Sequence, residues 1–133
     1  MLVQPLAHAV RFLHPSSILM RMDNCIFCKI GTHEIPKKPE DIKYEDDNFI
    51  AFLDIHPKAA GHTILIPKAH SRWFVDMPQE EWRGLMTAAQ TISKNIKTEY
   101  EADFVRLGIV GTDVPHVHVH LIPQKIHETE PKI

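Results

Sequence analysis

The stretch His116-Val117-His118-Val119-His120-Leu121-Ile122-Pro123 contains three histidines at two-residue spacing. Alternate side chains of a β-strand lie on one face, about 6–7 Å apart. The spacing therefore predicts a strand with three imidazoles on one side and Val117, Val119 and Leu121 buried on the other. Imidazole titrates near neutral pH and can act as a nucleophile, acid, base or metal ligand. Three aligned imidazoles backed by an apolar face predict a functional site.

Ordinary explanations of this stretch fit it poorly. A lone histidine in a strand is usually just a half-exposed residue, and a purification tag is a run of consecutive histidines, whereas here histidine alternates with valine. One alternative stays open, in which all three histidines serve as metal ligands. It predicts that His118 binds the metal and that chelation abolishes function.

Length and composition describe one ordinary domain. The chain has 133 residues, of which 44% are hydrophobic and 24% charged, as in soluble globular proteins with a single core. The net charge is −2 and the basic residues are scattered, so neither a nucleic-acid partner nor, without a long apolar run, a membrane partner is expected. The two cysteines do not form a secreted disulfide framework, and a reducing, cytoplasmic location is expected.

Residues 1–22 are set apart as an N-terminal extension, and the folded domain is placed at residues 23–133. The extension contains Arg11 and Arg21, no acidic residue and no clear apolar period. A targeting peptide is one explanation. The other is that translation starts at Met22, and we favour it because a small-residue cleavage pattern is missing.

The predicted elements before the middle of the chain are one short helix and three strands. Residues 25–30 predict the helix, which Gly31 ends, and the strands are predicted at 43–45, 48–55 and 62–67.

A long helix and two further strands complete the order. Pro78 and an acidic first turn begin the helix. A core stripe follows at helical spacing: Trp82, Leu85, Met86, Ala89, Ile92, Ile96 and Tyr100. A strand at 104–110 and a loop at 111–115 lead to the histidine strand. Short connections favour an antiparallel sheet with helices on one face, an α+β fold.

Four segments carry a resemblance to a known family: Cys25-Ile26-Phe27-Cys28-Lys29-Ile30, Ala51-Phe52-Leu53-Asp54-Ile55, Gly61-His62-Thr63-Ile64-Leu65-Ile66-Pro67-Lys68-Ala69-His70 and the histidine strand. Their order and spacing over residues 24–123 resemble the histidine triad (HIT) superfamily, most closely its histidine triad nucleotide-binding proteins. The resemblance implies a homodimer built on a five-stranded antiparallel sheet with one long and one short helix. It also implies an enzyme that hydrolyses or transfers nucleoside monophosphates carried on phosphoramidates or polyphosphates.

The resemblance implies covalent catalysis by histidines. The family's nucleophile corresponds to His118, which would attack the α-phosphorus and hold the nucleotide until water arrives. His120 would donate a hydrogen bond to the phosphate or help to protonate the leaving group. His62 would support and orient the triad, and His116 completes the catalytic set.

The resemblance also implies a nucleotide site. Asp54 matches the ribose-binding acid, whose two oxygens suit the 2′- and 3′-hydroxyls. Gly111 lies where backbone N–H groups approach the phosphate. The implied ligand is a purine nucleotide, with adenosine as the expected base, and no organic cofactor is implied. The apolar cleft for the base matches Phe27, Ile30, Ile35 and Ile55.

A metal site is predicted around the C-x-x-C motif of Cys25 and Cys28. Two thiolates at this spacing can bind zinc, but two further ligands are needed. The resemblance supplies His70 and His116 as those ligands of a structural zinc ion. Two free thiols or a redox pair remain alternatives. The other histidines that we expect on the surface are His33, His56 and His127.

The segment Val110-Gly111-Thr112-Asp113-Val114-Pro115 departs from the commoner family pattern Ala-Gly-Gln-x-Val. Thr112 replaces the glutamine, and Asp113 places negative charge near the expected phosphate. Arg106 either compensates for this charge or lies on the surface. Few residues follow Pro123, so substrate contacts from a longer C-terminal tail are expected to be missing.

Three functions follow from these residues. The leading one is a nucleoside phosphoramidase, and the second is a dinucleoside polyphosphate hydrolase, as in the fragile histidine triad branch. Both use the same histidine strand, so the sequence does not separate them. The third is a nucleotide-binding or partner-docking protein with residual activity, which the negative charge of Asp113 motivates.

Overall fold

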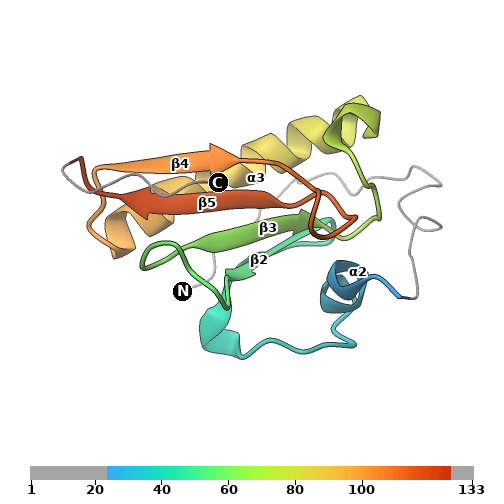
Figure 1. Ribbon diagram of the computed structural model, residues 1–133, viewed down its shortest axis with the longest axis horizontal. Helices are drawn as coiled ribbons and strands as arrows, with labels where there is room; N and C mark the ends of the chain where they lie inside the picture. Colours follow the sequence, from blue (N-terminus) through green and yellow to red (C-terminus); the bar gives the residue numbers. More distant parts are fainter. Residues whose placement is uncertain (1–23, 127–133) are drawn as a thin grey trace.

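The computed structural model describes residues 24–126, which form a five-stranded antiparallel sheet with two helices (Figure 1). The strands are β1 (Ile42–Glu45), β2 (Phe49–Leu53), β3 (Thr63–Pro67), β4 (Phe104–Gly108) and β5 (Val119–Gln124), in the order β1-β2-β3-β5-β4. The helices are α2 (Ile26–Gly31) and α3 (Gln79–Glu99), with short 3-10 turns η1 (Pro39–Asp41) and η2 (Phe74–Asp76). The predicted α+β class, strand number and helix lengths are confirmed. The extension at 1–22 and His127 lie outside the described residues.

The two helices cover opposite faces of the sheet. Ala51 and Leu65 belong to the core cluster that contains the buried side chains of α3. Their neighbours Phe52 and Ile64 belong to a second cluster, which contains Ile30 of α2. The prediction of helices on one face was therefore wrong. The helices lie on both faces because β2 and β3 are apolar at successive positions, so both faces of these central strands must be covered.

The helix α3 packs as its apolar spacing predicts. It follows Pro78, and its buried apolar side chains are Leu85, Ala88, Ala89, Ile92 and Ile96. The ring of Tyr100 lies against Gly61, which has φ +85°, and a Cβ at Gly61 would come within 2.4 Å of that ring. Only glycine fits there, and it leads directly into His62 and β3. Among the described residues, no helix combines the length and the apolar character that a membrane span requires.

The histidine strand is shorter than its spacing predicts. β5 begins at Val119, so His116 and His118 lie in the segment just before the hydrogen-bonded strand. β3 and β5 pair from Thr63↔Leu121 to Leu65↔Val119. Two residues further along, the same register would place Val117 opposite Pro67, which has no N–H to donate. The alternation itself is confirmed, because Val117, Val119 and Leu121 are all buried in the α3 cluster.

Candidate active site and metal centre

His118 is held with one ring nitrogen unprotonated in its neutral form. Its Nδ1 lies 2.7 Å from the carbonyl oxygen of His116, and a carbonyl can only accept, so Nδ1–H is the donor. In the neutral ring the lone pair is then on Nε2. The side chain is buried, and the Phe27 ring packs against it with 5.0 Å between ring centroids. The backbone of the histidine segment itself therefore sets the tautomer of His118.

A second chain of hydrogen bonds sets the tautomer of His120. The backbone N–H of Lys58 donates to Nδ1 of His62 at 3.1 Å, so the proton of neutral His62 is on Nε2. That Nε2–H donates to Nδ1 of His120 at 2.9 Å. Oδ2 of Asp54 lies 3.4 Å from Nε2 of His62. The proton of neutral His120 is consequently on Nε2.

The pKa values of this pair favour the neutral rings. Burial, together with the neighbouring His118 and His62, lowers the pKa of His120 to about 4, although the Asp54 and Asp113 carboxylates oppose this effect. Burial also lowers the pKa of His62, although the Asp54 carboxylate opposes this effect. At neutral pH both rings are uncharged, as the donor–acceptor chain requires.

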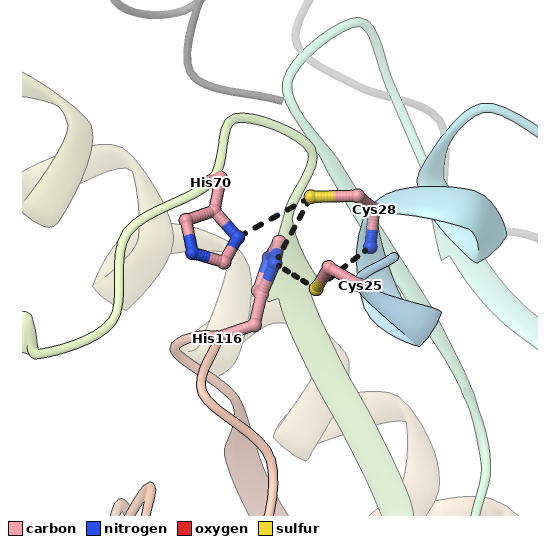
Figure 2. Close-up of side chains that lie close together, drawn as sticks. All are labelled: Cys25, Cys28, His70 and His116. Carbon is pink, nitrogen blue, oxygen red and sulfur yellow. Dashed lines mark hydrogen bonds between the residues drawn. The ribbon is translucent and has the colours of Figure 1, made fainter. Parts of the chain in front are cut away.

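His116 faces the two cysteines (Figure 2). Its Nε2–H donates to the carbonyl oxygen of Pro67 at 2.8 Å, so its lone pair is on Nδ1. That Nδ1 lies 3.3 Å from Sγ of Cys25 and 3.5 Å from Sγ of Cys28, while Nδ1 of His70 lies 3.3 Å from Sγ of Cys28. Both ring nitrogens of His116 are thus engaged away from the reactive nitrogen of His118.

The donor set of this cluster fits a zinc ion. The four ligand atoms, from Cys25, Cys28, His70 and His116, lie within 4.8 Å of one another. Burial lowers the pKa of His116 to about 4 and also lowers that of His70, so both imidazoles are neutral and can ligate. Two thiols and two imidazoles are a common ligand set of structural zinc. The structure brings together the four residues that the resemblance implied.

Three of the four residues that we expect to contact the base lie together in the structure. Phe27 and Ile35 pack against the second core cluster, to which the buried Ile30 belongs. Ile55 is 74% exposed and lies outside that cluster. Asp54 follows β2 and accepts the backbone N–H of His56 through Oδ1 at 2.8 Å. Its carboxylate retains lone pairs for ribose hydroxyls.

The loop before the histidines brings a carboxylate to Nε2 of His118. Gly111 has φ +88°, and the Trp73 ring lies where its Cβ would be in contact. Oδ1 of Asp113 lies 3.3 Å from Nε2 of His118. Arg106 donates instead to Gln124 at 3.1 Å, at the far end of β5 from Asp113.

A basic residue that the sequence did not single out lies at the site. A cavity of about 560 Å³ opens beside Asp113, between the start of α2 and the loops after β3 and before β5. Arg72 lines it, and its guanidinium stacks on the Trp73 ring with 4.7 Å from Cζ to the centroid. No sequence signal distinguishes Arg72 from the other scattered basic residues, because only folding brings it to this cavity.

Known proteins resemble this chain in sequence and structure. The family model described as HIT domain matches residues 36–127. An uncharacterized HIT-like protein of Methanocaldococcus jannaschii is 39% identical over 107 residues, which cover 75% of this chain and 78% of that protein. Adenosine 5′-monophosphoramidase HNT1 of Saccharomyces cerevisiae is 41% identical over 103 residues, which cover 76% of this chain and 63% of that protein.

The solved structures include a Zn-bound histidine triad family protein from Mycobacterium smegmatis. It is 31% identical and matches with a TM-score of 0.73, covering 80% of this chain and 78% of that one. The sequence order of the four quoted segments, the sheet and the family match agree with one another, and the chain belongs to the HIT family.

Proposed function

We propose that this protein is a nucleotide hydrolase of the phosphoramidase type, which cleaves nucleoside phosphoramidates to the nucleoside monophosphate through a nucleotidyl-His118 intermediate. The observation that carries the proposal is the hydrogen bond from Nδ1–H of His118 to the His116 carbonyl, which leaves the Nε2 lone pair free. The name of the yeast relative, an adenosine 5′-monophosphoramidase, supports this substrate class and adenosine as the base.

The first step is attack on phosphorus. Nε2 of His118 forms the bond to the α-phosphorus, and the leaving group departs with the electron pair of its bond to phosphorus. The ring becomes cationic, and its Nδ1–H stays on the His116 carbonyl, which stabilises that charge. The Nε2–H of His120 is available to a phosphoryl oxygen. Water then breaks the P–Nε2 bond, which releases the monophosphate and restores neutral His118.

The ribose and the base of the nucleotide would bind to residues around His118. Asp54 would accept the ribose hydroxyls, and Phe27, Ile30, Ile35 and Ile55 would contact the base, as the resemblance implies. The proximity of Asp54 to His62, at 3.4 Å, supports this assignment because it links ribose binding to the orientation of His120.

Cys25, Cys28, His70 and His116 would hold a structural zinc ion. When bound, the ion would cross-link α2 to the loops before β5 and after β3. The Zn-bound relative and the clustered donor atoms support this proposal. Cys25 and Cys28 are not joined in a disulfide, so both sulfur atoms can serve as zinc ligands. We expect this arrangement in a reducing compartment such as the cytoplasm.

The edge strand β4 would join two copies into a homodimer. β4 ends the sheet, and Leu107 is 47% exposed although its cross-strand partner Leu121 is fully buried. Leu107 lies on the same face of the sheet as the buried core, at an edge strand with no neighbour on its outer side among the described residues. Pairing of β4 with the same strand of a second copy would bury this side chain.

Turnover of an adenosine phosphoramidate by wild type and by His118→Ala tests the proposed function. Wild type should release the amine and AMP, and the variant should bind AMP without turnover. Equal turnover by both would contradict the mechanism. A second candidate, a nucleotide-binding protein with little activity, is favoured by the contact of Asp113 with the reactive nitrogen. It predicts binding without turnover in wild type as well.

A further inference from the structure

Asp113 stands at the reactive nitrogen with a carboxylate that the mechanism does not use. Its Oδ1 lies 3.3 Å from Nε2 of His118, where the phosphorus of a substrate must arrive. The Asp113 side chain is 68% exposed and follows the loop that begins at Gly111. It therefore has room to turn aside when substrate binds, while its backbone stays at the rim of the site.

The carboxylate stands at one end of a row of side chains. Asp54 contacts His62, His62 donates to His120, and the His120 and His118 rings lie 5.1 Å apart. Asp113 contacts Nε2 of His118, at 3.3 Å from its Oδ1. A substrate with its ribose on Asp54 and its phosphorus at Nε2 of His118 would therefore bring the leaving group within reach of the Asp113 carboxylate.

The cavity beyond Asp113 has room for that leaving group. Its volume is about 560 Å³, within the usual range for small-molecule sites. Apart from the metal-cluster side chains, its wall includes the charged residues Asp113 and Arg72 and the apolar Ile26, Val114 and Pro115. A group that departs into this cavity therefore passes the Asp113 carboxylate, which both lines the cavity and lies beside Nε2 of His118.

The carboxyl group of Asp113 is ionised at neutral pH. Burial acts to raise its pKa, but hydrogen bonds from the backbone N–H groups of Val114 and Asp113 itself, together with the nearby His118 and His120, hold the pKa below its usual value. The anion is therefore present when the bond to the leaving group breaks.

We propose that Asp113 is a specificity-determining residue, which favours leaving groups that depart as amines over leaving groups that depart as phosphate anions. The inference rests on the proposed function and names its substrate class. As Nε2 of His118 bonds to phosphorus, the P–N bond breaks and its electron pair goes to nitrogen, which takes two protons from solvent and leaves as an ammonium ion. The water that later hydrolyses the P–Nε2 bond returns one proton to solvent, and the new phosphate hydroxyl of AMP releases a second one, so the protons balance.

The physical basis is the charge of the leaving atom. A departing primary amine gains protons and becomes an ammonium ion, which the Asp113 carboxylate attracts as a charge-assisted hydrogen-bond acceptor. A departing polyphosphate oxygen gains negative charge, which the same carboxylate repels. Both substrates bring the same charge on the α-phosphoryl group, so the cost of placing that group beside Asp113 cancels between them.

The test compares kcat/KM for two substrates in three proteins. The substrates are AMP joined through a P–N bond to a primary alkylamine, and diadenosine polyphosphate. The proteins are wild type, Asp113→Asn and the control Arg72→Gln, which removes the opposite charge from the same cavity. In Asp113→Asn the ratio of kcat/KM for the P–N substrate to that for the polyphosphate should fall about tenfold. In Arg72→Gln the ratio should not fall.

An unchanged ratio in Asp113→Asn, or an equal fall in both variants, would overturn the proposal. Asp113→Asn should unfold at the same temperature as wild type, because the Asp113 side chain is exposed. A change in the kcat/KM ratio then does not come from a loss of folding. The two proposals fail differently. If wild type turns over neither substrate through His118, both the proposed function and the role of Asp113 are contradicted. If wild type turns over both substrates through His118 and the ratio is unchanged in Asp113→Asn, only the role of Asp113 is contradicted.

Discussion

At the scale of single residues, backbone groups determine which nitrogen of each key histidine carries the proton. The carbonyl of His116 accepts from the His118 ring, and the carbonyl of Pro67 accepts from the His116 ring. The backbone N–H of Lys58 donates to the His62 ring. Carbonyls only accept and N–H groups only donate, so no side-chain rearrangement is needed to leave Nε2 of His118 unprotonated. Three neighbouring imidazoles are thereby given different chemical roles by their backbone surroundings.

Replacing His62 should weaken catalysis through His120. His62→Ala removes the donor to Nδ1 of His120, so the tautomer and orientation of His120 are no longer fixed. We expect kcat/KM to fall about 10- to 100-fold, as for lost supporting groups at other sites. Lys58→Ala is the matched control, because it keeps the backbone N–H that donates to Nδ1 of His62. Full activity of His62→Ala would contradict this role.

The buried pair should also make stability depend on pH. The folded-state pKa values of His120 and His62 lie below the unfolded value near 6.5, so between about pH 6.5 and 4 the unfolded chain binds protons that the folded chain excludes. Stability is therefore constant above this window and decreases as pH falls through it. Urea unfolding at about pH 7 and about pH 5 should show a smaller decrease for His120→Gln than for wild type. An equal decrease would assign the pH dependence to other groups.

At the scale of elements, the short helix α2 depends on its side-chain cluster. It spans only Ile26–Gly31, and isolated helices of this length are not stable in water. Its packing on Ile50, Ile64 and Ile66 and the donor cluster at its start provide the missing stabilisation.

Removing one thiol should release the metal and loosen α2. For Cys28→Ser we expect less bound zinc and a melting temperature lower by about 4–8 °C for each kcal/mol lost. A chelator should lower the melting temperature of wild type and leave that of Cys28→Ser unchanged. His33→Ala is the control for metal content, because His33 is exposed and pairs with Glu45 outside the cluster. Zinc retained at wild-type level in Cys28→Ser would contradict the proposed ligands.

The elements also show how far the sequence alone leads. Periodicity was sufficient for α3 and for the alternation at Val117–Val119–Leu121, because each depends on one buried face. It failed for the placement of α2, since an apolar strand position does not tell which helix covers it. It also failed for the start of β5, where the missing N–H of Pro67 ends the pairing.

At the scale of the whole molecule, the site is assembled from distant parts of the chain. Sequence motifs named Cys25, Cys28, His70 and His116, but only the sheet brings their donor atoms together. The contact of Asp113 with His118 and the cavity lined by Arg72 could not be predicted, because they depend on loop conformations without a periodic signal.

The proposed dimer should dissociate when charge is placed on its edge. Leu107→Lys puts an ammonium group on the exposed core face of β4, where burial against a partner would be costly. Light scattering should give the dimer mass for wild type and the monomer mass for the variant. Glu40→Lys, exposed in η1 near the opposite edge of the sheet, should remain dimeric. A monomeric wild type would contradict the proposal.

The central claim is that His118 carries the nucleotide covalently. The most direct measurement is the intact mass of wild type and His118→Ala, quenched without acid shortly after mixing with an adenosine phosphoramidate. We expect a nucleotidyl adduct on wild type alone, together with release of AMP. An adduct of equal abundance on His118→Ala, or AMP release by wild type without any adduct under conditions where hydrolysis of the intermediate is slow, would contradict it.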